Sequence, residues 1–92
     1  MDKADLKKFM DGEKVKIWPA KKEAKMLVLE YLSSKFEEGK KYTEKEVNEI
    51  IDKYQTFSDH ATLRRELYDH YFLDRDPKDG LYWKEKEDKI PN

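Results

Sequence analysis

The sequence predicts a small α+β domain with three helices and a C-terminal β-hairpin. Apolar residues recur at spacings of three and four along the middle of the chain, and one of these segments opens with a capping box. Near the C-terminal end, two short β-prone runs flank a turn that contains proline and glycine. A length of 92 residues allows one compact core, because two domains would each have too little interior to offset the entropy of the chain.

The composition narrows the class of protein. Charged residues make up 45% of the chain and aromatic residues 13%, which together indicate a packed core under a heavily charged surface. No cysteine is present, so disulfides and thiolate metal sites are excluded. The longest apolar run, Met26 to Leu29, is far shorter than the roughly 20 residues of a membrane helix, and the N-terminus lacks the apolar region of a signal peptide. We therefore expect a cytoplasmic protein that does not associate with membranes.

The net charge of −1 gives the whole chain no electrostatic attraction for DNA. The basic excess lies in residues 1–25, which hold eight basic and five acidic side chains, whereas residues 59–92 hold seven and nine. Any contact with nucleic acid must therefore come from a local arrangement of charge.

The N-terminal residues 1–12 are predicted to form an amphipathic arm, followed by a short strand or a continuation of that arm. The stretch KVKIW, residues 14–18, alternates charged and apolar side chains, which is the period of a half-buried strand. Because extended geometry is favoured before a proline, the strand should end at Trp18, and a helix can begin at or just after Pro19.

Two amphipathic helices follow. The first is expected from Ala20 to about Phe36, and the second begins at Thr43, because Thr43 and Glu46 stand at the spacing of a capping box. The apolar residues expected to be buried are Ala24, Leu27, Val28, Tyr31, Leu32 and Phe36 in the first helix and Val47, Ile50, Ile51 and Tyr54 in the second.

The stretch HATLRRELYDHYFL, residues 60–73, is predicted to form the third helix, with Ser58 or Asp59 as its N-cap. Leu63 and Leu67 set its buried direction, and Tyr71 is expected on the same side. His60 and His70 lean toward that side too, and we expect both to be partly buried and hydrogen-bonded. The residues expected on the exposed side are Ala61, Thr62, Arg65 and Asp69, with Arg64 at the flank.

A β-hairpin is expected from residues 72–75 and 81–84, because Pro77 and Gly80 suit the first and the left-handed closing positions of the turn between them. The charged residues 85–92 are expected to form a flexible tail. A strand or arm, three helices and a hairpin follow one another in a winged helix-turn-helix, so residues 13–84 are predicted to be winged-helix-like. In such folds the third helix can enter the major groove of DNA while the hairpin, called the wing, touches the backbone.

From Leu6 to Lys84 the chain resembles the bacterial domain-of-unknown-function family numbered 2087. The stretches that carry the resemblance are IWPAK, YTEKEVN, TLRREL and YWK. That family occurs as a free-standing small protein and as the C-terminal part of proteins described as transcriptional regulators. The resemblance therefore implies a role in transcription regulation and assigns no ligand or activity. The acidic, tyrosine-rich stretch YDHYFLDRDPKDG departs from the family pattern and weakens the expected contact between the wing and phosphate.

The three arginines of the chain, Arg64, Arg65 and Arg75, are the strongest candidates for contact with DNA, because arginine suits two-pronged binding to guanine or phosphate. If DNA is bound, Thr62 and Arg65 should face the bases and Arg64 and Arg75 the phosphates, while Asp69 would oppose binding. Alternatively, the arginines form ion pairs with nearby acids, including those of the second helix, as surface arginines commonly do.

Three lysines of the N-terminal half, Lys16, Lys21 and Lys22, are further candidates, because lysines around an exposed aromatic such as Trp18 can bind a nucleic-acid backbone. The alternative is an edge strand whose lysines are solvated and guard it against pairing.

A function of a different class also fits the sequence. The aromatic residues Tyr68, Phe72, Tyr82 and Trp83 could bind a protein partner or a second copy of the chain. The two histidines lie about 15 Å apart along a helix, too far to share a metal ion. No nucleophile elbow or glycine-rich phosphate loop occurs, so we expect no enzyme, no cofactor and no small-molecule ligand.

Overall fold

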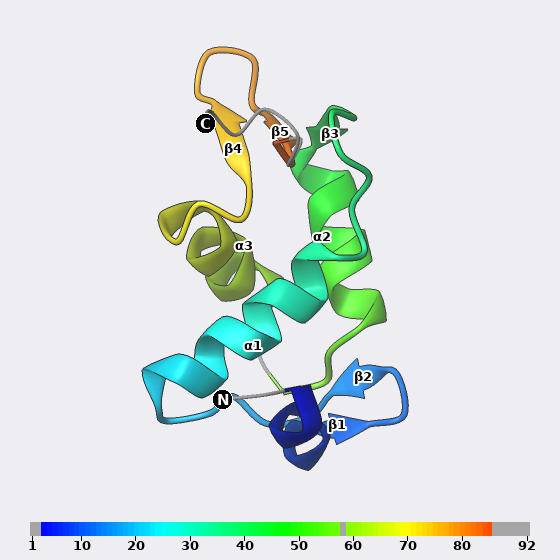
Figure 1. Cartoon of the computed structure of the whole chain (residues 1–92). Helices are drawn as coiled ribbons and strands as arrows, with labels where there is room; N and C mark the ends of the chain where they lie inside the picture. Colours follow the sequence, from blue (N-terminus) through cyan, green and yellow to red (C-terminus); the bar gives the residue numbers. More distant parts are fainter. Residues whose placement is uncertain (1–2, 58, 86–92) are drawn as a thin grey trace.

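The computed structural model describes residues 3–57 and 59–85, and within them three α-helices and two small antiparallel sheets form an α+β fold (Figure 1). The helices are α1 (Lys22–Ser33), α2 (Glu44–Lys53) and α3 (His60–Asp69), and the strands are β1 (Met10–Asp11), β2 (Lys14–Val15), β3 (Tyr42–Thr43), β4 (Asp74–Asp76) and β5 (Leu81–Trp83). A short 3₁₀ helix, Lys3–Phe9, precedes β1. The predicted tail from residue 86 onward and Ser58, one candidate N-cap, lie outside the described residues.

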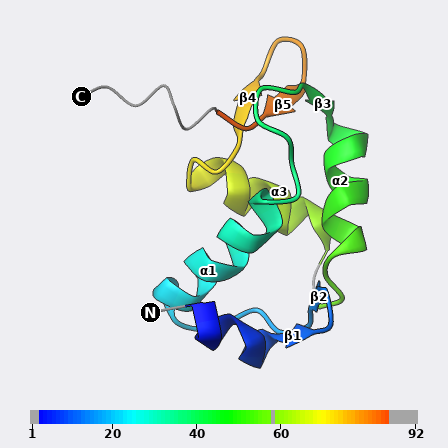
Figure 2. The ribbon, with the colours of Figure 1, turned by 45° about the vertical axis from the view of Figure 1, so that its right-hand side comes forward.

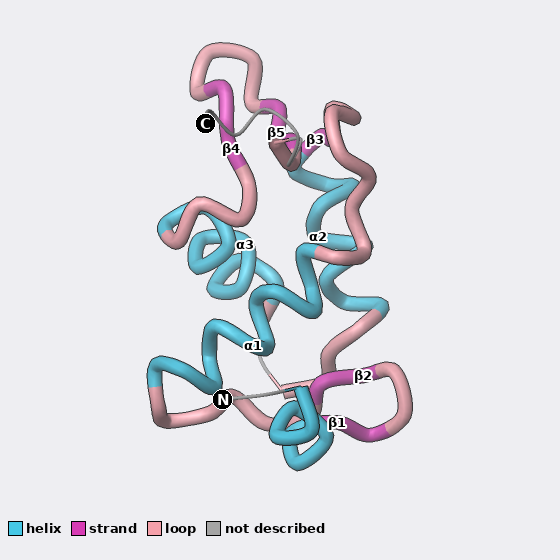
Figure 3. Tube along the Cα trace, in the orientation of Figure 1, coloured by secondary structure: helices cyan, strands magenta, loops and turns pink. Residues whose placement is uncertain are grey.

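The two sheets lie at opposite ends of the molecule (Figures 1 and 2). β1 and β2 form one sheet, and the other has the strand order β3-β5-β4, so that β5 pairs with a strand on each side. Figure 3 shows the helices occupying the space between these two regions of strand. No helix in residues 3–57 or 59–85 is long and apolar enough to cross a membrane.

Apolar side chains from all three helices and from both sheets form one core. Its buried members are Val15, Val28, Leu29, Leu32, Phe36, Tyr42, Val47, Ile51, Leu63, Leu67, Leu73 and Tyr82. Val15 ties the N-terminal hairpin to this core, because its N–H donates to the Tyr54 carbonyl at 2.8 Å and its carbonyl accepts from the Thr56 N–H at 2.9 Å.

The N-terminal strand is shorter than predicted. Pairing between β1 and β2 ends where Met10 faces Val15, and Ile17, which was expected to continue the strand, is 47% exposed. Gly12 makes the tight turn between the two strands possible, because its φ of +63° lies in the left-handed region.

The first helix is also shorter than predicted, whereas the start of the second is confirmed. After Ser33 the backbone tightens, and the Lys35 N–H donates to the carbonyl of Leu32, three residues back, at 3.1 Å. At the start of α2 the Glu46 N–H donates to Thr43 Oγ1 at 3.1 Å and the Thr43 N–H donates to Glu46 Oε1 at 2.8 Å, which completes the capping box.

The start of α3 is confirmed at Asp59, whose Oδ1 accepts from the Thr62 N–H at 2.7 Å. The end of α3 comes before the predicted one, because Tyr71 adopts a left-handed conformation with φ of +66°. The Tyr71 N–H donates to the Tyr68 carbonyl at 3.1 Å and the Phe72 N–H to the Leu67 carbonyl at 2.9 Å, the bonding of a Schellman motif.

The prediction that Tyr71 is buried is therefore wrong. The residue is 89% exposed, because the left-handed turn takes it off the helical face that Leu63 and Leu67 define. Leu73, two residues further on, is buried in its place.

The predicted C-terminal hairpin is present as β4 and β5, and Gly80 closes its turn with φ of +68° as expected. The third strand of this sheet, β3, was not predicted. It places Tyr42 opposite Tyr82, and Tyr82 also faces Arg75 across the hairpin. The sheet thus fixes the start of α2 beside the hairpin, because β3 leads directly into that helix.

Candidate nucleic-acid interface

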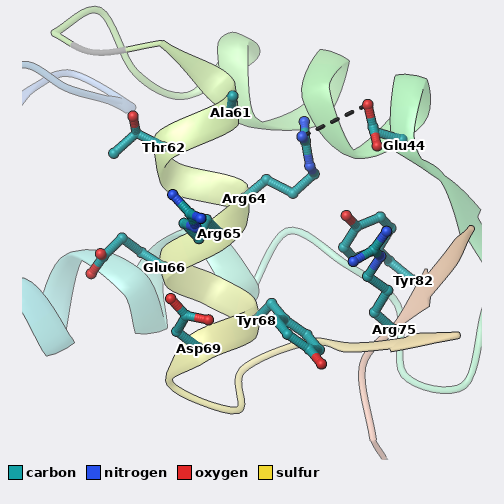
Figure 4. Close-up of a pocket in the computed structure, with 10 residues that line it drawn as sticks. All are labelled: Glu44, Ala61, Thr62, Arg64, Arg65, Glu66, Tyr68, Asp69, Arg75 and Tyr82. Atoms are coloured by element: carbon teal, nitrogen blue, oxygen red, sulfur yellow. Dashed lines mark ion pairs between the residues drawn. The ribbon is translucent and has the colours of Figure 1, made fainter. Parts of the chain in front are cut away.

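An open groove of about 650 Å³ lies between the outer face of α3, the start of α2 and the β4–β5 hairpin (Figure 4). The residues that line it are Glu44, Ala61, Thr62, Arg64, Arg65, Glu66, Tyr68, Asp69, Arg75 and Tyr82. All three arginines of the chain are among them. The packing of the hairpin beside α3 therefore brings Arg75 to the same surface as Arg64 and Arg65.

Arg64 points from α3 toward α2 (Figure 4). Its Nη1 donates to Asn48 Oδ1, its Nη2 lies 3.7 Å from Glu44 Oε2, and its side chain is only 17% exposed. This contact with an acid of α2 matches the alternative considered for the arginines. Arg64 thus fastens the outer face of α3 to the first turns of α2.

Arg65 and Arg75 are exposed. The guanidinium carbon of Arg75 lies 5.9 Å from the centre of the Tyr82 ring, a ring that is itself only 5% exposed. Arg65 forms no hydrogen bond or ion pair with any residue that the structure describes. Thr62 is exposed one turn before it on α3, so these three side chains offer the groove one hydroxyl and two positive charges.

Three carboxylates line the same groove. Glu44 is engaged by Arg64, and Glu66 Oε1 lies 3.4 Å from His70 Nε2. Asp69 forms no ion pair within the described chain, and it is the acid that would oppose a phosphate most directly.

Two aspartates beside the groove stabilise local backbone structure, one at the start of α3 and one in the turn of the β4–β5 hairpin. Asp59 caps α3, and the hydrogen bond from the Thr62 backbone N–H lowers the pKa of its carboxyl. In the hairpin, Asp76 Oδ1 accepts from the backbone N–H of Lys78 at 2.9 Å, and this bond, with a second from Asp79, lowers the pKa of Asp76. Both carboxylates are therefore charged where they hold the backbone.

The structure does not bring the candidate lysines to this groove. Lys16, Lys21 and Lys22 are exposed near β2 and at the start of α1, at the end of the molecule opposite the β4–β5 hairpin (Figure 1). Trp18 is half-buried, stacks on Phe57 with ring centres 5.9 Å apart, and carries a lysine Nζ 5.5 Å above its ring.

The candidate aromatic residues differ in exposure. Tyr68 is 42% exposed, Phe72 and Trp83 are half-buried, and Tyr82 belongs to the core. Trp83 is further occupied within the chain, because its Nε1 donates to Glu85 Oε2 at 2.8 Å. Sequence reasoning did not place Tyr71 among the exposed residues, although it is the most exposed of the large apolar side chains described.

Both histidines are half-buried, as expected, and the hydrogen bond expected of His60 is present, with its Nδ1 2.7 Å from Asp52 Oδ2. His70 Nε2 lies 3.4 Å from Glu66 Oε1. Within the described residues, no group of three or more histidine, aspartate or glutamate side chains is arranged to hold a metal ion.

A family model, described as an uncharacterized protein conserved in bacteria (DUF2087), matches residues 14–84. No curated protein and no solved structure gives a significant match. The matched range contains the three helices, the three-stranded sheet and every residue that lines the groove. Together with the resemblance seen in the sequence, this match makes the chain a member of the bacterial family DUF2087.

Proposed function

We propose that this chain is a cytoplasmic winged-helix domain that acts in bacterial transcription regulation as a DNA-binding protein rather than an enzyme. In this proposal α3 enters the major groove and the β4–β5 hairpin is the wing. The observation that carries it is the convergence of all three arginines on one groove between α3 and the hairpin.

The order of the elements supports the winged-helix assignment. A short strand, β3, stands between α1 and α2, and it pairs with β5 at the side away from β4. This pairing ties the hairpin to the start of α2, and α2 packs against α3. The hairpin and α3 therefore line one groove, where a wing has to lie if both are to reach one duplex.

The contacts of each arginine support different roles for the three. Arg65 forms no ion pair with a residue in 3–57 or 59–85, so it has none to lose there when it binds a base or phosphate, and Thr62 lies on the same exposed face. Arg75 lies over the Tyr82 ring on the hairpin and is assigned to the DNA backbone. Arg64 already bonds Asn48 and lies near Glu44, so we assign it to positioning α3.

Fluorescence anisotropy of a labelled random-sequence duplex tests this proposal. Because binding to phosphates releases counterions, the affinity should fall steeply from about 50 mM to about 200 mM salt. Replacing Arg65 or Arg75 by alanine should weaken binding and reduce the salt slope by about 0.9 for each phosphate that the protein no longer neutralises. Lys45, exposed on α2 and outside the groove, provides the control, and Lys45→Ala should leave the slope unchanged.

Two results would contradict the proposal. An absence of binding at about 50 mM salt would exclude general DNA contact. Equal losses in Arg65→Ala, Arg75→Ala and Lys45→Ala would show binding driven by net charge alone, with no role for the groove.

A further inference from the structure

We propose that Tyr68 and Tyr71 form a docking surface for a segment of a protein partner that presents a lysine or arginine side chain. The two tyrosines line a hollow of about 250 Å³ together with Asp69, Asp74 and Arg75. This hollow adjoins the groove described above, because Tyr68, Asp69 and Arg75 line both. The inference concerns a second ligand and does not depend on DNA binding.

The exposure and backbone conformation of Tyr71 are the first observations that support this docking surface. Tyr71 is 89% exposed and Tyr68 is 42% exposed, and neither residue belongs to the hydrophobic core or packs against it. Tyr71 also stands at the left-handed position of a Schellman motif, where glycine is the usual residue. The fold would therefore be served at least as well without this side chain, and the ring is free to serve an external contact.

The other aromatic rings of the chain provide the second step, because many of them have a lysine or arginine of the same chain over one face. Lysine Nζ atoms lie over Trp18 at 5.5 Å, Tyr31 at 4.7 Å, Tyr54 at 4.8 Å, Tyr42 at 5.2 Å and Trp83 at 3.6 Å, and Arg75 lies over Tyr82 at 5.9 Å. Within the described residues no lysine or arginine lies over Tyr68 or Tyr71. These two ring faces are thus open to a cation from another molecule.

The charge around the two rings decides the kind of partner. Asp69 comes from the last turn of α3 and Asp74 from the start of β4, so the hollow has two carboxylates beside the one guanidinium of Arg75 and its lining is acidic by one charge. A cation over an aromatic face gains further from a nearby carboxylate, whereas a phosphate beside Asp69 is repelled. This combination favours a basic protein segment over a nucleic acid as the occupant of the hollow.

The experiment is an NMR titration of the full ¹⁵N-labelled chain with a short peptide in which arginine alternates with glycine. A peptide with glutamine in place of each arginine is the control ligand. The arginine peptide should produce saturable shifts at Tyr68, Asp69 and Tyr71, and the glutamine peptide should not. Tyr71→Gly and Asp69→Asn should each weaken binding by roughly threefold to fivefold.

Two features keep the test separate from loss of folding. Tyr71→Gly retains the left-handed turn, so a folded spectrum with weaker peptide binding supports a direct contact. Glu49→Gln removes one carboxylate from the exposed face of α2, outside the hollow, and should bind as the unaltered chain does.

The proposal is overturned if both peptides shift the same signals equally, if neither binds at millimolar concentration, or if Tyr71→Gly binds the arginine peptide normally. It is also overturned if the tyrosine signals shift on concentrating the protein without peptide, because the occupant would then be a second copy of the chain.

Discussion

Replacing Tyr71 by glycine should stabilise the protein. Tyr71 has φ of +66°, and the left-handed conformation costs a residue with a β-carbon roughly 1–2 kcal/mol. Glycine removes this cost but loses more chain entropy on folding, a penalty of roughly 0.5–1 kcal/mol. Because Tyr71 is 89% exposed, removal of its ring gives up little buried apolar area. The two ranges leave a net gain of about 0–1.5 kcal/mol, and the central value of about 0.75 kcal/mol corresponds to a rise in Tm of roughly 3–6 °C.

The hydrogen bonds that end α3 do not oppose this substitution. The Tyr71 N–H donates to the Tyr68 carbonyl and the Phe72 N–H to the Leu67 carbonyl, and both are backbone groups that glycine leaves in place. Scanning calorimetry and urea unfolding at neutral pH measure the change.

Tyr71→Ala is the matched control, because it removes the ring and keeps the β-carbon in the left-handed region. It should therefore show no comparable gain. The reasoning is refuted if Tyr71→Gly is less stable than the unaltered chain, because the ring would then contribute more than the strain costs. Equal stability of the alanine and glycine variants would refute it as well.

Three further predictions concern the turns and caps. Gly80→Ala should cost about 1 kcal/mol in urea unfolding, because Gly80 has φ of +68° and an added β-carbon would meet no atom within 4 Å, so backbone strain is the main effect. Thr43→Ala should cost about 1 kcal/mol and lower the Tm, since it removes the acceptor of the capping box, while Thr43→Ser should retain most of the stability. Asp59 and Asp76 have pKa values lowered below the ordinary 3.8, so their stabilising contribution is complete above that pH and is lost as the pH falls through the lowered values. The free energy of unfolding, measured with urea, should therefore decline as the pH is lowered into the acid range. The decline should be shallower in the variant with Asn at both positions, because Asn keeps the hydrogen-bond acceptors but does not titrate. An unchanged decline in that variant would exclude these two groups as its cause.

The helix starts could be predicted from the sequence because each depends on a few neighbouring residues. The capping box needs only the three-residue spacing from Thr43 to Glu46, and Asp59 caps α3 through the N–H of Thr62. The strand β3 could not be predicted in this way. It has only two residues, too few for a periodic pattern, and its partner Tyr82 lies forty residues from Tyr42, so its pairing depends on the folded arrangement of the helices.

The end of α3 was missed for a different reason. Tyr71 follows Leu63 and Leu67 at intervals of four, which is the pattern of one buried face. A glycine at position 71 would have indicated the end of the helix, because glycine is the usual residue at the left-handed position. A tyrosine there gives no such indication. Tyr71 was therefore predicted to complete the buried face, but the left-handed turn directs it away from that face.

The candidate site was predictable in part. Arg65 and Arg75 line one groove because the hairpin packs beside the preceding helix, an arrangement that the order of elements indicated. The orientation of Arg64 could not be predicted, because it depends on Asn48 and Glu44. Both residues are distant from Arg64 in the sequence, and the sequence alone offered several acids as equally good partners for it. The positions of Lys16 and Lys22 also could not be predicted. They are close to each other in the sequence, but this does not fix their distance from the hairpin in the folded chain.

Asp69 connects the two proposed ligands, because it lines both the arginine groove and the tyrosine hollow. Its charge opposes a phosphate bound by Arg65 or Arg75 and favours a cation bound over Tyr68 and Tyr71. Asp69→Asn should therefore raise DNA affinity by roughly twofold to fivefold at low salt while it weakens the arginine peptide.

Glu49→Gln changes the net charge by the same amount at a distance from both ligands and should alter neither affinity appreciably. If Asp69→Asn moved both affinities in the same direction, the two ligands would not be discriminated by the charge of this residue. Opposite changes, with Glu49→Gln unchanged, would mean that the charge of Asp69 discriminates between the two ligands, because the same carboxylate repels a phosphate and attracts a cation.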